Sequence, residues 1–184
     1  MEPLEILSNE HGLIRQYVDH LAIAAEKMQV GDRPPREFFD KAIQFSREFA
    51  GQYHHVKEEY MMFVRLAMKK GGAMDGEIEA LRHQHETGRN YISSIAGSLD
   101  GYERGDPGRT STILENLGAY ISMERQHIHK EDHMFFPMVK QEFTEKDMEQ
   151  VSAEFDNARK KAGDDVFEKH HKLVVEMGSL LQHM

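Results

Sequence analysis

Residues 54–63 read HHVKEEYMMF, and residues 127–136, 73 positions later, read HIHKEDHMFF. The two stretches share five identical positions, among them a His that is followed four residues later by a Glu. These pairs are His54 with Glu58 and His127 with Glu131. Residues four apart lie above one another on an α-helix, so each stretch predicts a helix that presents an imidazole and a carboxylate on one face.

A weaker repeat precedes each of these stretches. Residues 11–17 (HGLIRQY) and 85–91 (HETGRNY) share a His, an Arg four residues later and a Tyr six residues later, at an offset of 74. Because the two offsets agree within one residue, the chain is predicted to consist of two related helical hairpins. Each hairpin carries a lone His, His11 or His85, on its first helix and a His-x-x-x-Glu motif on its second.

Breaker residues divide the chain into segments. Gly and Pro are concentrated in residues 30–37, 69–77 and 103–110, and between them apolar residues recur at spacings of three and four. The pattern predicts an all-α protein, an antiparallel up-down four-helix bundle with helices of roughly 25 to 35 residues. We expect the bundle to occupy residues 1–142, and one or two accessory C-terminal helices in residues 143–184 to pack on it.

The breakers also set the relative height of the helices. In three pairs of residues on neighbouring helices, the midpoint of the pair falls within a breaker, so the two residues are expected to lie level in an antiparallel hairpin. The pairs are His11 with His54, Glu58 with His85, and His85 with His127. Together with Glu131 these side chains are predicted to converge on one central cavity. His55, rotated by about 100° from His54, is expected at the edge of the same face as a further imidazole.

The overall composition narrows the chemistry. The 184 residues fit one domain and contain no Cys, so any metal must be held by nitrogen and oxygen ligands. The net charge of −9 argues against a nucleic-acid partner, which a basic surface would recognise. No stretch approaches 18 apolar residues, and the first residues do not resemble a signal peptide. We therefore expect no membrane partner and a cytoplasmic location.

A cluster of His and Glu in a helical core is expected to bind two metal ions. Buried carboxylates are costly unless cations compensate them, and Glu58 and Glu131 would approach from opposite sides, as bridging ligands do. Nitrogen-rich ligation favours two Fe ions over calcium or magnesium, with Zn or Mn as substitutes. Two octahedral ions that share an oxo or hydroxo group would leave about one open coordination position, where dioxygen, nitric oxide or peroxide would bind.

Four motifs together carry a resemblance to a known family. NEHGLIR, YHHVKEEYMMF, RHQHETGR and HIHKEDHMFFP, all within the first 140 residues, resemble in order and spacing the signature of hemerythrin-like (HHE cation-binding) domain proteins. The resemblance implies a non-haem di-iron site within a four-helix fold. Its implied ligands are His11, His54, Glu58, His85, His127 and Glu131, with His55 as the seventh.

The sequence departs from the oxygen-carrying hemerythrins at two points. Their third helix carries two His four residues apart, whereas the residue four after His85 is Arg89. Their last carboxylate is an Asp five residues after its His, whereas Glu131 follows His127 by four residues and Asp132 by five. These departures favour sensing, storage or redox reactivity over reversible oxygen carriage.

Three functions stay open at this point. The first is a protein that binds or senses O2, NO or iron status. The second is a di-iron enzyme of peroxide or nitric oxide detoxification. The third is a metal-stabilised interaction module, in which a homodimer is one arrangement.

Several His and Glu residues have a competing interpretation. His83 competes with His85 as the ligand of the third helix. The pairs ERQH (124–127) and EKHH (168–171) fit the Glu-x-x-His pattern of ferritin-like di-iron proteins, which would leave the 73-residue repeat unexplained.

The remaining conspicuous side chains receive ordinary roles. Arg15, Arg89 and Glu59 are expected at the surface or as outer partners of the site. Residues expected at the surface are His129, His133, His170, His171 and His183. Residues expected in the core are Tyr17, Tyr91, Met61, Met62, Phe63, Met134, Phe135 and Phe136.

Overall fold

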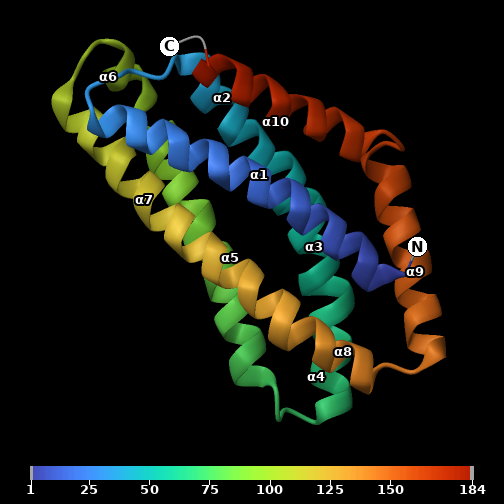
Figure 1. Ribbon diagram of the computed structural model, residues 1–184. Helices are drawn as coiled ribbons and strands as arrows, with labels where there is room; N and C mark the ends of the chain where they lie inside the picture. The colour runs from blue at the N-terminus through green and yellow to red at the C-terminus, as the bar shows by residue number, and fades with distance from the viewer. Residues whose placement is uncertain (1, 183–184) are drawn as a thin grey trace.

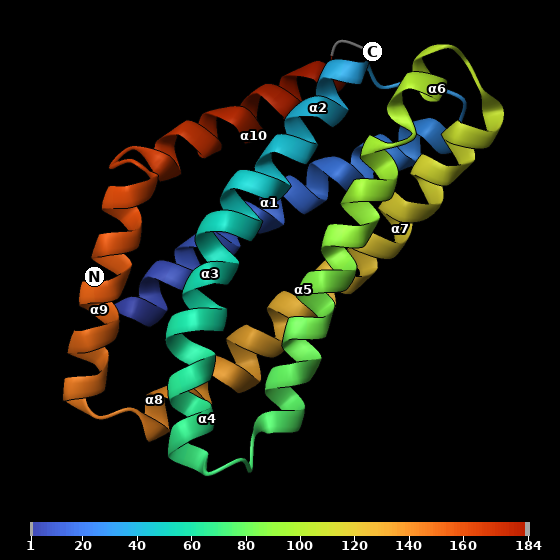
Figure 2. The ribbon, with the colours of Figure 1, turned by 180° about the vertical axis from the view of Figure 1, so that it is seen from behind.

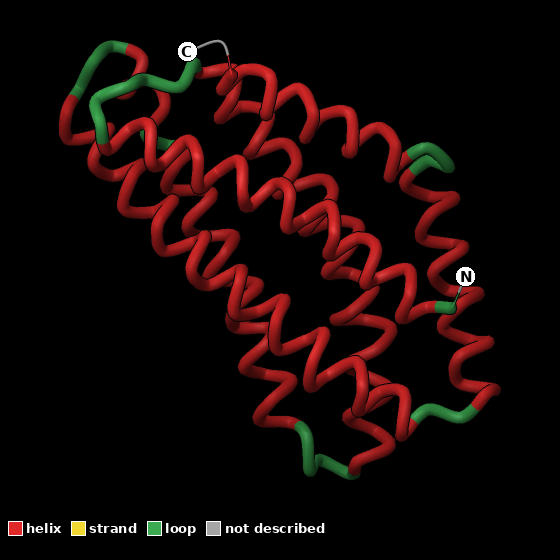
Figure 3. Tube along the Cα trace, in the orientation of Figure 1, coloured by secondary structure: helices red, strands yellow, loops and turns green. Residues whose placement is uncertain are grey.

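A computed structural model describes residues 2–182, and every regular element in that range is a helix (Figures 1 and 3). The predicted all-α class is therefore confirmed. The elements, in which η marks a π-helical stretch, are α1 (Pro3–Gln29), α2 (Arg36–Phe45), η1 (Ser46–His54), α3 (His55–Lys57), η2 (Glu58–Phe63), α4 (Val64–Lys70), α5 (Asp75–Ala96), α6 (Leu99–Glu103), α7 (Pro107–Lys130), η3 (Glu131–Phe135), α8 (Phe136–Glu142), α9 (Glu145–Ala162) and α10 (Val166–Gln182).

Long helical segments of the first 142 residues lie lengthwise beside one another in both views (Figures 1 and 2). They are α1, the unbroken run from α2 to α4, α5, and the unbroken run from α7 to α8. Helix α1 contacts α7, α7 contacts α5, and α5 contacts α2 and η1. The first two connections fall within the predicted breakers 30–37 and 69–77, whereas the third begins at residue 97, before the predicted breaker 103–110. Helix α5 has 22 residues, fewer than expected, and the short α6 follows it.

The apolar spacing accounts for the interior. Residues repeated at three and four on α1 and α2, such as Tyr17, Leu21 and Phe45, are at most 1% exposed. The buried apolar residues form two clusters. One is built from α2, η1, α6, α7 and α10 with the later parts of α1 and α5. The other is built from η2, α4, η3, α8 and α9 with the first parts of α1 and α5. The chain positions that separate the two clusters are those that carry the conspicuous His and Glu residues.

The two C-terminal helices pack on the long segments. Helix α9 begins with a capping box, in which the Asp147 carboxylate accepts a hydrogen bond from the Thr144 amide at 2.7 Å. Val151 and Phe155 of α9 join the second apolar cluster. Helix α10 contacts α1 and α2 and adds Val174, Met177 and other residues to the first cluster.

One surface prediction, His170, and one core prediction, Met134, are wrong. His170 is 2% exposed, because it lies on the apolar face of α10, four residues after Val166 and four before Val174, against the rings of Phe45 and Phe49. Met134 is 63% exposed instead of buried, because its position in η3 faces outward. His129, His133 and His171 are exposed as predicted. His183 lies outside the described residues.

Within residues 2–182, no helix combines the length and the apolar character that crossing a membrane requires.

The packing of α9 predicts a stability difference. Phe155→Ala removes a ring that is 2% exposed, and we expect it to lower the free energy of unfolding by about 3 to 5 kcal/mol. Tyr60→Ala, at a position that is 69% exposed, serves as the control and should change it by less than about 0.5 kcal/mol. Urea denaturation followed by circular dichroism measures both. Equal effects of the two substitutions would contradict the packing of α9 on the cluster.

Candidate metal centre

The structure brings all seven predicted site residues together in the layer between the two apolar clusters. His11 comes from α1 and His85 from α5. The second long segment contributes His54, His55 and Glu58, and the last contributes His127 and Glu131. Each of the seven side chains is buried, with exposed fractions from 0% to 8%. His83, the competitor of His85, is exposed.

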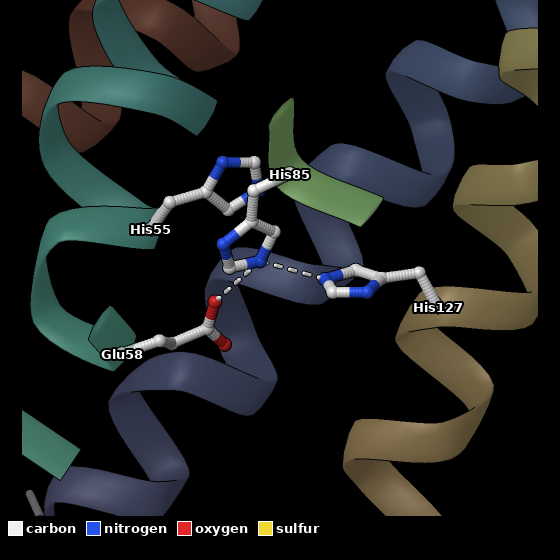
Figure 4. Close-up of side chains that lie close together, drawn as sticks. All are labelled: His55, Glu58, His85 and His127. Carbon is white, nitrogen blue, oxygen red and sulfur yellow. Dashed lines mark hydrogen bonds and ion pairs between the residues drawn. The ribbon is translucent and has the colours of Figure 1, made fainter. Parts of the chain in front are cut away.

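The seven side chains form two groups that could each hold a metal ion. Within each group the candidate ligand atoms lie within 4.8 Å of one another. The first group, drawn in Figure 4, is His55, Glu58, His85 and His127, and the second is His11, His54, Glu58 and Glu131. Because Glu58 belongs to both groups, the two candidate positions are adjacent and share a carboxylate.

The inward nitrogen atoms converge on the two carboxylates. Glu58 Oε1 lies 3.2 Å from His54 Nε2, and Glu58 Oε2 lies 3.5 Å from His85 Nε2. Glu131 Oε2 lies 3.2 Å from His11 Nε2 and 3.3 Å from His127 Nε2. Each carboxylate is thus reached by imidazoles of both groups.

Several inward atoms have no hydrogen-bond partner although they are buried. These atoms are His11 Nε2 and both carboxylate oxygens of Glu58 and of Glu131. Leaving such groups unsatisfied costs about 1 to 3 kcal/mol each, and more for charged groups. A cation held between them would satisfy all of these atoms at once, so the donor set fits a metal.

The outer nitrogens of four imidazoles bind side chains that follow the same repeat. The acid after each motif Glu accepts a hydrogen bond from the lone His of the other hairpin: Asp132 from His11 Nδ1 at 2.8 Å, and Glu59 from His85 Nδ1 at 2.7 Å. Arg15 binds Asp132, and Arg89 lies 3.6 Å from Glu59. Arg15, Arg89 and Glu59 thus lie around the cluster as outer partners, as predicted.

The residue before each lone His supplies the other two partners. Glu10 Oε2 accepts from His54 Nδ1 at 2.8 Å, and Gln84 Oε1 accepts from His127 Nδ1 at 3.0 Å. Sequence reasoning missed both, although extending the weaker repeat by one residue would have paired them. A hydrogen bond at Nδ1 fixes the ring and directs Nε2 to the metal, which is the usual arrangement around metal-bound His.

The hydrophobic neighbours of the site also repeat. Phe136 stacks on His11 with ring centroids 5.2 Å apart, and Phe63 stacks on His85 at 6.1 Å. Phe63 and Phe136 occupy equivalent positions in the two repeated stretches. Each lone His is therefore held by an acid at its outer nitrogen and by a Phe against its ring.

The match to known proteins agrees with this geometry. The hemerythrin HHE cation-binding domain family matches residues 2–139. The chain belongs to this family. Membership implies cation binding, and the buried His and Glu groups of this HHE domain fit a metal site.

Two curated relatives are uncharacterized proteins of Mycobacterium tuberculosis and Mycobacterium bovis. Each is 26% identical to the HHE chain over 136 residues, which cover 74% of this chain and 52% of the relative. The chain therefore spans about half the length of the curated relatives it matches. No solved structure gives a significant match.

The backbone around the HHE site contains π-helical turns at equivalent points of the repeat. Glu58 begins η2 and Glu131 begins η3, while η1 ends at His54. Such turns hold one more residue than an α-helical turn and occur often at functional sites. They change the angular spacing of the side chains, and the adjacent His54 and His55 both reach the centre, one in each group. Nothing in the sequence pattern indicated these turns.

Charge is distributed unevenly over the imidazoles. Burial lowers the pKa of His54, but the Glu58 charge at 3.2 Å and the hydrogen bond to Glu10 outweigh it and raise the pKa to about 9. Burial likewise opposes protonation of His11, and its hydrogen bonds, first of all to Asp132, hold the pKa well above the usual range. The raised pKa values favour positive charge on these two rings, beside the two buried carboxylates.

In the other group, burial opposes protonation of His85, but its hydrogen bond to Glu59 and the charge of Glu58 raise its pKa as well. The remaining two imidazoles of that group behave in the opposite way. Burial and the charge of His85 hold the pKa of His55 well below its usual range. Burial lowers the pKa of His127 to about 4, against the attraction of Glu131. Neutral imidazoles are the form that binds metals, so these two rings need lose no proton to act as ligands at neutral pH.

The ferritin-like alternative is not supported by the placement of its acids. Glu168 lies exposed on α10, whereas Glu124 is 2% exposed in α7, so the two do not share a site. Neither belongs to the groups that could hold a metal among the described residues. Glu124 is nevertheless unusual, because it is a buried carboxyl whose Oε1 has no hydrogen-bond partner.

The titration of Glu124 predicts a pH-dependent stability in the metal-free protein. Burial raises its pKa to about 7, from about 4.3 in an unfolded chain. The folded state therefore holds this proton more tightly, so the resulting stabilisation is present below about pH 4 and is lost as the pH rises through about 7.

We expect the unfolding free energy of the unsubstituted protein, relative to Glu124→Gln, to fall by up to about 3 kcal/mol between pH 4 and pH 8. Urea denaturation of both metal-free proteins at a series of pH values measures this difference. A difference that does not vary with pH would contradict it.

Proposed function

We propose that the chain is a non-haem di-iron protein that binds or senses a small ligand, O2, NO or iron status, at an open coordination position. The observation that carries the proposal is the buried cluster of five imidazoles and two carboxylates, whose carboxylate oxygens have no hydrogen-bond partner. A protein core accepts such a cluster when cations complete it.

The proposed ligands are divided between the two groups. His55, His85 and His127 would hold one ion, and His11 and His54 would hold the other. Glu58 is proposed as a bridge because it belongs to both groups. Glu131 is proposed as a second bridge because its Oε2 lies 3.2 Å from His11 Nε2 and 3.3 Å from His127 Nε2.

The proposed metal is iron, with zinc or manganese as substitutes. Seven ligands with five nitrogen atoms suit iron, whereas calcium and magnesium prefer oxygen shells. Bound iron would supply one-electron chemistry and a position for a diatomic ligand or peroxide. The protein residues exclude water from that position, since the cluster is buried between two apolar clusters.

Sensing or reactivity is proposed over reversible carriage. Asp132, which stands five residues after His127 where oxygen carriers have a ligand, binds His11 Nδ1 and Arg15 instead. Arg89 replaces the second His of the third helix and lies beside Glu59, outside the cluster.

The wider setting is also part of the proposal. Short turns join the long segments of residues 1–142, which supports an antiparallel up-down four-helix bundle with α9 and α10 as accessory helices in residues 143–184. We propose a cytoplasmic location, because the chain lacks Cys, and a homodimer as the assembly to test. A partner protein, nucleic acid or membrane is not required for the proposed chemistry.

Anaerobic titration with Fe(II) tests the metal assignment. We expect two ions per chain and, after oxidation, a visible absorption band that changes reversibly with O2 or NO. His127→Ala should reduce the iron bound, because it removes a ligand of one position, and His129→Ala is the matched control on the same helix.

A colourless preparation without stoichiometric iron would overturn the di-iron proposal. Stoichiometric metal with a spectrum that neither O2 nor NO changes would instead support a metal-stabilised structural module.

The buried carboxyl of Glu124 favours a second candidate, an enzyme of peroxide or nitric oxide detoxification. Glu124 lies on α7 one turn before His127, and its pKa, raised by burial to about 7, suits a group that gains and loses a proton at neutral pH. In this candidate Glu124 would give a proton to, or take one from, the bound small molecule.

Peroxide consumption by the iron-loaded protein tests this candidate. We expect turnover that is lost in His127→Ala and reduced about 100-fold or more in Glu124→Gln, which keeps the shape of the side chain without its proton exchange. Unchanged iron content in Glu124→Gln is the control. No turnover of either peroxide or nitric oxide by the loaded protein would remove the enzyme candidate.

A further inference from the structure

The residues that accept hydrogen bonds from the outer imidazole nitrogens occupy equivalent positions in the two repeats. At one pair of equivalent positions, however, the two residues differ in charge. His54 Nδ1 binds the carboxylate of Glu10, whereas the equivalent His127 Nδ1 binds the neutral amide of Gln84. The repeat also equates Lys57 with Lys130. Lys57 is 0% exposed and binds Glu10 Oε1, whereas Lys130 is exposed.

The Glu10–Lys57 pair is buried, and two aromatic rings lie beside its Lys. Glu10 is 2% exposed. Lys57 Nζ lies 3.6 Å from the centre of the Tyr53 ring and 5.3 Å from that of Phe155, which belongs to α9. Replacing a buried ion pair by apolar residues is often neutral or stabilising, so stability alone does not explain why both charges are present.

A carboxylate at the outer nitrogen of a metal-binding His makes the imidazole a stronger donor. Both imidazoles of the second group have one, since His11 binds Asp132 and His54 binds Glu10. In the first group only His85 has one, through Glu59. His127 has an amide partner, and His55 Nδ1 is buried with no partner.

We propose that Glu10 is a positioning residue that strengthens metal binding at the His11–His54 position alone, and that Lys57 holds the Glu10 side chain in place against His54 through its ion pair. The two metal positions would then differ in affinity for a reason outside the ligands themselves. This inference rests on the proposed function, because it requires two metal positions.

Stepwise metal binding by the full chain tests the inference. Co(II) and, under anaerobic conditions, Fe(II) are titrated in competition with a chelator, which yields one dissociation constant for each position. His85→Ala, which removes a ligand of the other position, identifies which constant belongs to which. The test variant is the double substitution Glu10→Gln with Lys57→Met, which copies the neutral arrangement of Gln84 and leaves no unpaired buried charge.

The double variant should still bind two ions. We expect the dissociation constant of the His11–His54 position to rise about 10- to 100-fold and the other constant to stay unchanged. The matched variant Gln84→Glu places a carboxylate at the half-buried position equivalent to Glu10. It should lower the dissociation constant of the metal position that contains His127 and leave the other unchanged. Circular dichroism and urea denaturation of the metal-free variants establish that each is folded.

Unchanged constants, or equal shifts of both, would overturn the inference, because a general structural effect has no preference for one position. If the unsubstituted chain binds fewer than two ions, the dinuclear proposal itself fails. This outcome is distinct from unchanged or equally shifted constants, which overturn the inference on Glu10 alone. If the double variant does not fold, Gln84→Glu decides alone, and its failure to strengthen the His127 position overturns the inference.

Discussion

The structure depends on two buried carboxylates that imidazoles approach from both candidate metal positions. Glu58 and Glu131 are both 0% exposed, and their oxygens have no hydrogen-bond partner among residues 2–182. Two such groups in a helical interior cost several kcal/mol unless positive charge compensates them. The four long segments must therefore meet at one height, so that every imidazole reaches a carboxylate. The apolar clusters on either side keep water away from this layer.

Rings that bind a metal also have to be held still, and the outer contacts do this. Asp132, Glu59, Glu10 and Gln84 each fix one imidazole through its Nδ1 atom, and Phe136 and Phe63 flank two of the rings. The resulting arrangement has an approximate twofold relation between the hairpins. It is broken at His55, which has no equivalent, and at the charged Glu10–Lys57 pair.

The C-terminal helices support the layer of His and Glu side chains by packing beside it. They lie beyond the 2–139 range of the family match, yet Val151 and Phe155 of α9 complete the second apolar cluster. Phe155 also covers Lys57, so α9 closes the chain of contacts that runs through Glu10 to His54. Helix α9 thus contacts the layer of candidate metal ligands through Lys57 and Glu10.

The sequence by itself determined the helical class, the positions of the first two turns and which His and Glu residues meet, whereas the turn after α5 begins at residue 97, before the predicted breaker. It could do so because the 73-residue repeat and the breakers relate positions along the chain to heights in an antiparallel arrangement. It missed features that depend on how faces pack: the inward direction of His170, the exposure of Met134 and the burial of Lys57. Only the tertiary structure decided these, because burial is set by what packs against a helix face. The π-helical turns at Glu58 and Glu131 belong with them, since no residue pattern marks where a turn takes in one more residue.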